Sequence, residues 1–381
     1  MLKAQTLHPK ELSAEQVGAW RALASAQPAF ASPLLGPDFA QAVGEWRDDA
    51  RVSVFERDGQ TVGFLAHHRR PGGLARPIGA PLADYHALIS DRTAALTGGQ
   101  ALTAAGLAAY RFTGLVDPFG VFAADVAASQ ESHVVVLNNG PDAYLEAVRA
   151  ANPKKFKNYR RLEHKLERDL GEAVMIGPDH SWDAFDQLIA WKREQLRRTG
   201  SHDFLGPDWI RRLFAALFEM RDGDFQGLMV NLYAGGRLVA GQFGVRQGGV
   251  FHPWLASTDP ELAAYSPGQM FLSRAIGLLP DLGLTVFDLG PGHDHYKRPY
   301  ALTQIRIGEG LATAASPAGR FASRRERAWT AAGAHRGGVA GRLRRRLDLI
   351  ATVELSSTRR VLGFAQALAD QTRRKSLIPA E

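Results

Sequence analysis

Two distant segments of this chain share one pattern, in which a strand, a glycine turn and a second strand follow each other. Residues 52–70 read VSVFERDGQTVGFLAHHRR, and residues 228–246 read LMVNLYAGGRLVAGQFGVR. Alternating apolar residues on both sides of a D-G or G-G dipeptide are typical of a β-hairpin. Helical spacing of apolar residues precedes each hairpin. The repeat therefore predicts an α/β fold with two similar halves.

The second hairpin belongs to a longer run of alternating elements. Apolar spacing predicts helices over 154–170, 181–199, 207–221, 268–279 and 361–370, and strands over 133–137, 227–234, 237–247, 249–257 and 285–289. We expect three parts: an N-terminal half (1–150) that shapes a cleft, a C-terminal half (151–315) that holds the reacting groups, and a basic helical extension (316–381).

The extension differs from the rest of the chain in charge. Residues 311–381 hold 14 Lys or Arg and 5 Asp or Glu, whereas the preceding residues hold 32 and 34. A basic segment favours an anionic partner such as a nucleotide, a nucleic acid, a phospholipid or an acidic polymer, although we do not expect DNA. The alternative is a solvated, arginine-rich helical surface without a partner. The arginines whose spacing suits phosphate groups are Arg320, Arg324, Arg342, Arg345 and Arg346.

Several classes of protein are excluded or disfavoured by what the chain lacks. It has no cysteine, which excludes disulfides, thiolate metal sites and a cysteine nucleophile. It has no apolar run long enough for a membrane-spanning helix, no signal peptide, and no P-loop, nucleophile-elbow or dinucleotide fingerprint. The histidines at 67, 68, 293 and 295 lack a third metal ligand in register, so we expect no metal. We expect a cytoplasmic protein, peripheral at most at the inner face of the membrane.

The densest group of reactive side chains lies in FDLGPGHDHYKRPY, residues 287–300. Asp288 stands inside an apolar strand, where a carboxylate is costly unless it is paired or faces a cleft. The G-P-G turn that ends at Gly292 lets the backbone approach a ligand. A functional site is therefore predicted at the end of this strand.

A second motif, YSPGQ at residues 265–269, predicts the start of a helix. Ser266 suits the N-cap, and Pro267 suits the first helical position. The free N–H groups at such a helix start can hold a phosphate group.

These motifs resemble those of the GNAT acetyltransferases of the cellulose-biosynthesis (CelD/BcsL) type, which are relatives of the Fem peptidoglycan aminoacyltransferases. The resemblance covers residues 30–310 and rests on GRLVAGQFGV (236–245), YSPG (265–268) and FDLGPGHDHYK (287–297), with further support from SPLLGPDF (32–39), ADYH (83–86) and KKFKNYRRLEHKLER (154–168). It implies two tandem GNAT-like halves, acetyl-CoA as the donor, and an amine, often on a sugar, as the acceptor.

The resemblance also implies roles for particular residues. The pantetheine arm would pair with strand 249–257, and the pyrophosphate would lie near the helix start. The implied donor-binding residues are Ser266, Gly268, Gln269, Arg274 and Gly292; the catalytic ones are Asp288, Lys297, Tyr296 and His252; and the acceptor-binding ones are Asp84, Tyr85 and His86. Lys297 would stabilise the oxyanion or a phosphate, and Tyr296 would protonate the leaving thiolate. The general base stays open between Asp288, His252 and a water molecule.

The function that agrees best with this resemblance is N-acetylation of an amino sugar in an exopolysaccharide, in a holdfast-type biofilm adhesin, or in a precursor of either. One alternative is a Fem-like aminoacyltransferase of cell-wall synthesis, which would usually carry a long coiled-coil arm; residues 154–199 show no sustained heptads. Another is a regulatory effector that binds cyclic di-GMP through the arginines of the extension. An anionic membrane surface would compete for the same arginines.

Overall fold

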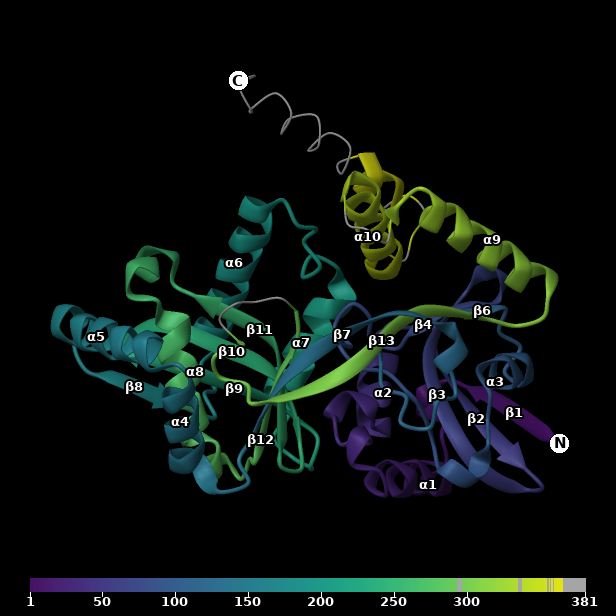
Figure 1. Cartoon of the computed structure of the whole chain (residues 1–381), viewed down its shortest axis with the longest axis horizontal. Helices are drawn as coiled ribbons and strands as arrows, with labels where there is room; N and C mark the ends of the chain where they lie inside the picture. Colours follow the sequence, from purple (N-terminus) through teal and green to yellow (C-terminus); the bar gives the residue numbers. More distant parts are fainter. Residues whose placement is uncertain (293–296, 335–337, 355, 357, 359, 366–381) are drawn as a thin grey trace.

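One mixed sheet of 13 strands runs through both predicted halves in a computed structural model of the chain, which describes residues 1–292, 297–334, 338–354, 356, 358 and 360–365 (Figure 1). From one edge to the other the strands are β1 (Leu2–Leu7), β2 (Ala50–Arg57), β3 (Gln60–Arg70), β4 (Leu74–Pro77), β6 (Ala109–Leu115), β13 (Thr303–Thr313), β7 (Val126–Val136), β12 (Val286–Pro291), β11 (Val250–Thr258), β10 (Arg237–Gln247), β9 (Gln226–Ala234) and β8 (Ala173–Ile176), while β5 (Leu88–Ser90) pairs with β3.

The order of strands is the same when it is read inward from either edge. The run β1-β2-β3-β4-β6 in the first half corresponds to β8-β9-β10-β11-β12 in the second. In both runs the last pair is parallel and the preceding pairs are antiparallel. The predicted hairpins are β2–β3 and β9–β10, at corresponding places. The prediction of two similar α/β halves is therefore confirmed.

The two central strands exchange partners between the halves. β7, the last strand of the first half, pairs with β12 of the second half through Ser132–Val136. β13, which follows the second half, pairs with β6 of the first half. β7 and β13 also pair with each other. The sheet is continuous for this reason, and the predicted domain limits at 150 and 315 lie just beyond these two strands.

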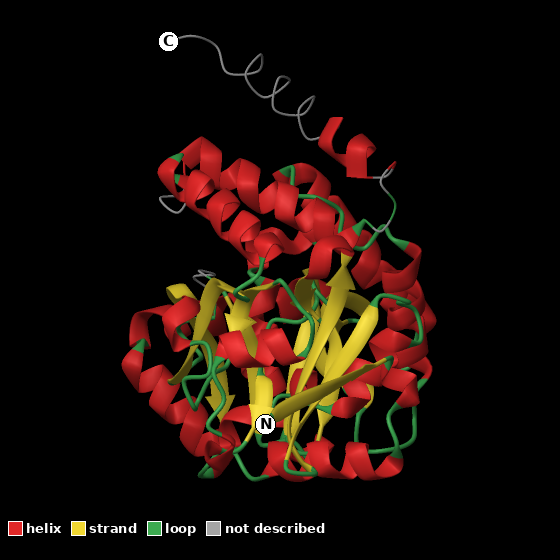
Figure 2. Cartoon of the chain, turned by 90° about the vertical axis from the view of Figure 1, so that its right-hand side faces the viewer, coloured by secondary structure: helices red, strands yellow, loops and turns green. Residues whose placement is uncertain are grey.

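Helices cover both faces of the sheet (Figure 2). The helices that precede and flank the strands are α1 (Ala14–Ser25), α2 (Pro37–Gly44), α3 (Gly98–Ala104), α4 (Gly140–Ala151), α5 (Pro153–Leu170), α6 (Trp182–Thr199), α7 (Asp208–Glu219) and α8 (Pro267–Leu278). One buried cluster joins α1 and α2 to α6 and α7 and so belongs to both halves. Within it the Trp254 ring lies 5.8 Å from Phe39 and 5.7 Å from Phe214. This shared core fixes how the halves meet.

Local sequence signals explain many of the element boundaries. Ser13 and Gln16 form a capping box at α1, and Ser181 caps α6, which ends at Gly200 in the left-handed conformation. Sequence periodicity overlooked β1, β4, β5, β6, β8 and β13, and it placed the start of β7 at His133 instead of Val126. β13 reads TQIRIGEGLAT, in which polar residues and two glycines mask the alternation. It forms because β6 and β7 supply hydrogen bonds on both sides.

The basic extension forms helices α9 (Pro317–Ala331) and α10 (Gly338–Val353), above the sheet in Figure 1. Asp348 of α10 lies 2.8 Å from Arg76 and 3.1 Å from Arg111, both in the first half. Trp209 of α7 donates to the Val353 carbonyl at 3.4 Å, so α10 contacts both halves. Of the predicted helix 361–370, residues 361–365 are helical and the others lie outside the described residues. None of the described helices is long and apolar enough to cross a membrane.

Candidate active site

Two neighbouring parallel strands separate in the middle of the second half. β11 and β12 pair only through Val250 with Val286 and Phe251 with Phe287, although both strands continue beyond these residues. A bulge in β11, where Trp254 stands unpaired between Pro253 and Leu255 opposite Gly244 and Phe243 of β10, bends β11 where it leaves β12. Gly244 permits this approach, because a Cβ atom there would lie 2.1 Å from the His252 carbonyl oxygen. The gap between the strands therefore opens directly after His252.

Asp288 lies on β12 at the edge of this gap and is almost completely buried. Its Oδ1 atom accepts hydrogen bonds from the Tyr85 hydroxyl at 2.7 Å and from the Gly290 N–H at 2.9 Å. The Tyr85 hydroxyl also lies 2.5 Å from the Ser132 hydroxyl on β7. Burial, followed by the charge of Asp288, raises the pKa of Tyr85, so this side chain stays neutral and donates. The buried Asp288 thus has the partners that its position in an apolar strand required.

His252 lies between two carboxylates. Its Nε2 atom is 3.1 Å from Asp84 Oδ2, and its Nδ1 atom is 3.5 Å from Asp288 Oδ2, the second contact being an ion pair rather than a well-formed hydrogen bond. Burial alone would lower the pKa of His252, but the two carboxylates, Asp288 foremost, raise it to about 9. At neutral pH His252 is therefore an imidazolium that bridges the two halves.

The loop that carries Asp84 is held in place by β6. The His86 backbone pairs with the Gly114 and Val116 backbone groups, and the His86 ring accepts the N–H groups of Thr113 and Gly114. Burial lowers the pKa of His86 to about 3, so this ring is neutral. Gly114 is required here because a Cβ atom would lie 1.8 Å from the Asp84 carbonyl oxygen. His86 thus orients the loop and lies away from the gap, whereas Asp84 and Tyr85 reach it.

Solvent reaches this cluster through Asp84. The Asp84 side chain is 36% exposed, whereas those of His252 and Asp288 are 0% and 5% exposed. Gly290 lies beside Asp84 with φ of 76°, and a Cβ atom there would lie 2.9 Å from Asp84 Oδ2. An incoming molecule would therefore meet the Asp84 carboxylate first, with the imidazolium behind it.

A cavity of about 490 Å³ lies at the start of α8, next to the far end of β11. Ser266, Gly268 and Gln269 line it, together with Gln242 of β10. Gln242 is 5% exposed, and the Oε1 atoms of Gln242 and Gln269 have no hydrogen-bond partner among the described residues. Ser266 precedes the helix in the left-handed conformation, without a side-chain cap. A ligand with amide and phosphate groups fits this set of donors and acceptors.

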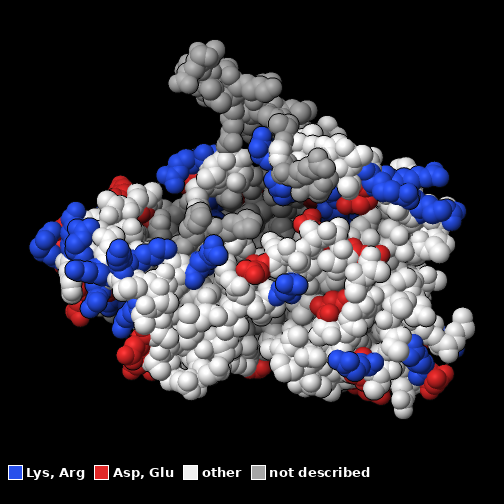
Figure 3. All heavy atoms as spheres, viewed as in Figure 1, with Lys and Arg blue, Asp and Glu red and all other residues white. Residues whose placement is uncertain are grey.

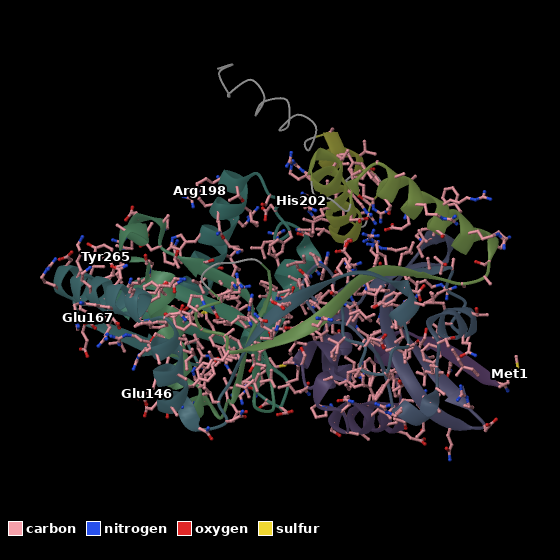
Figure 4. All side chains as sticks on the ribbon, in the orientation of Figure 1. Met1, Glu146, Glu167, Arg198, His202 and Tyr265 are labelled. Atoms are coloured by element: carbon pink, nitrogen blue, oxygen red, sulfur yellow. The ribbon has the colours of Figure 1, made fainter. Side chains whose placement is uncertain are left out.

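Sequence reasoning missed the cations that line this cavity, Lys192 and Arg198 of α6. Both lie on one helix face with Trp191 and Gln195, a spacing visible in the sequence once α6 is assigned. Figure 4 labels Arg198 and, at the end of the short helix η7 (Pro260–Tyr265), Tyr265. The predicted Arg274 does not reach the cavity, because it bonds to Glu163 and Glu167 of α5 and to the Ala173 carbonyl.

The loop after β12 holds the remaining predicted residues. Gly292 directly follows β12 with φ of 127°, and the Lys297 ammonium donates to the Pro291 carbonyl at 3.1 Å. Burial lowers the pKa of His133 on β7, and the charges of Lys297 and Arg298 also act to lower it. Tyr296, like His293 and His295, lies outside the described residues.

The predicted phosphate-binding arginines of the extension lie on two helices. Arg320 and Arg324 are exposed on α9, Arg342 and Arg345 are exposed on α10, and Arg346 is partly buried. Binding of cyclic di-GMP by these residues stays a prediction. His67 and His68 are both buried and bond to the Leu65 carbonyl and to Asp49. Among the described residues no three His, Asp or Glu side chains are placed to share a metal ion.

A larger cavity, of about 960 Å³, lies between the halves at the other end of β11. The segment from α1 to α2 and the turn at 247–249 line it, and none of the predicted site residues does.

Comparison with known proteins gives one family match. Residues 153–298 match the family described as Acetyltransf_6, Acetyltransferase (GNAT) domain. No curated protein matches the chain. The matched segment contains β11, α8 and β12, and with them His252, the helix start and Asp288.

Solved structures with similar folds share little sequence with the chain. They include the C-terminal domain of a putative lysylphosphatidylglycerol synthetase from Agrobacterium fabrum (13% identity, 82% of this chain and 95% of that one, TM-score 0.44). FemX follows with 11% identity over 81% and 96% of the two chains and a TM-score of 0.49. A tandem GNAT protein from the clavulanic acid pathway has 12% identity, 83% and 99% coverage, and a TM-score of 0.44.

The α/β fold and the family match together define the class of protein: it is an acyltransferase. More narrowly, residues 153–298 match a GNAT acetyltransferase domain. The fold class predicted from the sequence, two tandem GNAT-like halves with a helical extension, is confirmed.

Proposed function

We propose that this protein transfers an acetyl group from acetyl-CoA to an amine at the gap between β11 and β12. The observation that carries the proposal is the Asp84–His252–Asp288 cluster, which lies where the two strands separate. One end of the gap leads toward the cavity at α8. The exposed carboxylate of Asp84 faces solvent from the other half of the protein.

The cavity supports a pantetheine-bearing donor. The unpaired carbonyl oxygens of the Gln242 and Gln269 side chains could accept hydrogen bonds from its amide N–H groups. The N–H groups at the start of α8, with Lys192 and Arg198, suit its phosphates. Beyond Phe251 the edge of β11 is free of β12 and can pair with an extended chain. Bound there, acetyl-CoA supplies an activated thioester carbonyl.

The residues around Asp84 support an amine as the acceptor. A carboxylate on the open side of the gap attracts an ammonium group and can accept its proton before or during attack. The imidazolium of His252 holds this carboxylate in place and, with Asp288 behind it, stays charged up to a pH of about 9. Asp84 is thus the base we favour over His252. It takes one proton from the ammonium group and passes it to solvent, and it takes a second proton from the attacking nitrogen and passes it to the leaving thiolate. The nitrogen forms the amide bond as the thiolate leaves.

An amino sugar of a surface polysaccharide, or its precursor, is the acceptor we propose. The support for it is the resemblance of FDLGPGHDHYK (287–297) and neighbouring motifs to enzymes of the cellulose-biosynthesis type, together with the acidic entry at Asp84. Use of acetyl-CoA would place the reaction in the cytoplasm.

The test compares Asp84→Asn with the wild type, with acetyl-CoA and glucosamine as probes and release of the CoA thiol as the readout. The chain contains no cysteine, so a thiol reagent reports only the product. Loss of a general base should lower kcat about a hundredfold or more. Asp142→Asn, which changes an exposed carboxylate on α4, is the matched control and should behave as the wild type. A folded Asp84→Asn enzyme within twofold of wild type would contradict the assignment.

A further inference from the structure

Helix α5 carries a stripe of positive charge along its outer face. Its buried residues, Phe156, Leu162 and Leu166, fix it to the core of the second half. Seven exposed cations occupy the other side: Lys154, Lys155, Lys157, Arg160, Arg161, Lys165 and Arg168. From Lys154 to Arg168 the stripe is about 21 Å long at 1.5 Å per residue. Figure 3 shows Lys and Arg gathered over the end of the molecule that α5 forms.

The position of these charges on the helix works against helix stability. The first turn of α5 contains Lys154 and Lys155 and no acidic residue, although the N-terminus of a helix favours negative charge. Such a placement stabilises the helix less than the reverse arrangement would, so folding does not account for it.

The acidic residues of α5 offset the stripe only at its C-terminal end, where Asp169 pairs with Arg168, because Glu163 and Glu167 bond to another helix. Glu163 and Glu167 bond to Arg274 of α8, and Asp169 bonds to Tyr265 and to Arg168. Among the described residues no ion pair involves Lys154, Lys157 or Arg161. The stripe is therefore a rigid, net positive surface.

This surface borders the donor cavity. The Lys165 ammonium lies 5.1 Å from the centre of the Tyr265 ring, and the Tyr265 hydroxyl donates to Asp169 at 2.9 Å. The next residue, Ser266, lines the cavity at α8. Figure 4 labels Tyr265 and Glu167 at this same end of the molecule. A molecule that reaches into the cavity past η7 would thus pass beside α5.

We propose that α5 is the docking surface for an acidic acyl carrier protein, which presents its acyl group on a phosphopantetheine arm to the cavity at α8. This inference rests on the proposed function, since it assigns a second source to the same pantetheine donor. A stripe of about 21 Å extends well beyond the reach of the phosphates of one CoA molecule and complements an extended anionic surface. The helix start holds a single glycine, Gly268, and a carrier-bound arm brings only one phosphate to it.

The chemistry is the same as with acetyl-CoA and is balanced without another reactant. The thioester bond between the acyl carbon and the carrier's pantetheine sulfur breaks, and an amide bond to the acceptor nitrogen forms. The proton of the amine passes to Asp84 and then to solvent or to the thiolate, and the holo carrier protein leaves with its thiol.

The experiment measures transfer to glucosamine from two donors, acetyl-CoA and an acetylated bacterial acyl carrier protein, in three versions of the full chain. Lys157→Glu/Arg161→Glu reverses two charges in the middle of the stripe, where each new glutamate gains a cation one turn along the helix, Arg160 for Glu at 157 and Lys165 for Glu at 161, and should not harm folding. KM for the carrier donor should rise about tenfold or more, because charge complementarity is lost, whereas KM for acetyl-CoA should change less than twofold. Lys3→Glu/Arg327→Glu reverses two exposed charges elsewhere and should leave both KM values unchanged.

The outcomes separate the inference from the proposed function. Activity with acetyl-CoA but none with the carrier would overturn the docking proposal and leave the proposed function standing. An equal rise in KM for both donors in Lys157→Glu/Arg161→Glu would assign the stripe to the binding of CoA and would also overturn the docking proposal. Titrations with labelled holo carrier protein compare its affinity for the wild type and for Lys157→Glu/Arg161→Glu. Equal affinity for the two, together with binding of RNA or of anionic vesicles through α5, would assign the surface to another partner. Inactivity with both donors would overturn the proposed function itself.

Discussion

The buried imidazolium of His252 should make the stability of this protein fall at alkaline pH. Its folded-state pKa is about 9, against 6.5 for an unperturbed histidine, because two carboxylates more than offset the cost of burial. A raised folded-state pKa adds stability that is fully present below pH 6.5 and is lost as pH rises through about 9. At about 1.4 kcal/mol for each tenfold change in proton affinity, this contribution is on the order of 3 kcal/mol.

The assay is urea unfolding of the wild type and of His252→Gln at several pH values from 6 to 10. Other groups titrate in this window, so the informative quantity is the difference between the two proteins in how much stability is lost. We expect the wild type to lose about 3 kcal/mol more than the variant over this range. His164→Gln, a change on the exposed face of α5, should match the wild type. Equal alkaline loss in the wild type and His252→Gln would refute the reasoning.

Three further changes test other parts of the structure. Gly290→Ala should lower the free energy of unfolding by about 1–2 kcal/mol, because alanine tolerates φ of 76° poorly. It should also lower kcat, because the new Cβ atom would displace Asp84. An unfolding curve checks the first effect and the thiol assay checks the second. Gly268→Trp fills the donor cavity from a position with room for a Cβ atom, so KM for acetyl-CoA should rise about tenfold with an unchanged melting temperature; unchanged KM would place the donor elsewhere. Asp348→Asn leaves the largely buried Arg76 without a carboxylate partner among the described residues and should cost about 2 kcal/mol in urea unfolding. Burial raises the pKa of Asp348, but nearby arginines more strongly lower it, so this cost should shrink as pH falls below 4. A pH-independent cost would contradict the ion-pair explanation.

Elements with strong local signals were predictable from the sequence. The hairpins at 52–70 and 228–246 were visible because a glycine turn and alternating apolar residues are local properties. α5 was visible because Phe156, Leu162 and Leu166 recur at helical spacing. β13 escaped because its stability comes from two neighbouring strands rather than from its own pattern.

The candidate site was predictable only in part. Asp288 stood out because a carboxylate in an apolar strand requires partners, and the structure supplies Tyr85 and a backbone N–H group. The sequence could not show that Asp84 rather than His86 faces the gap, since the conformation of the loop at 83–86 decides which side chain points there. Ser132 carried no signal of its own, because it joins the cluster through the pairing of β7 with β12.

The sequence by itself determined the elements with strong local patterns, their order, the two similar halves and the helix start at 266–269, all of which depend on interactions between near neighbours. Only the tertiary structure decided that Asp84 meets His252, a residue 168 positions away. This contact depends on the exchange of β7 and β13 between the halves and on the core that they share. Such long-range packing is set by the summed burial of many side chains, and no single segment of the sequence records it.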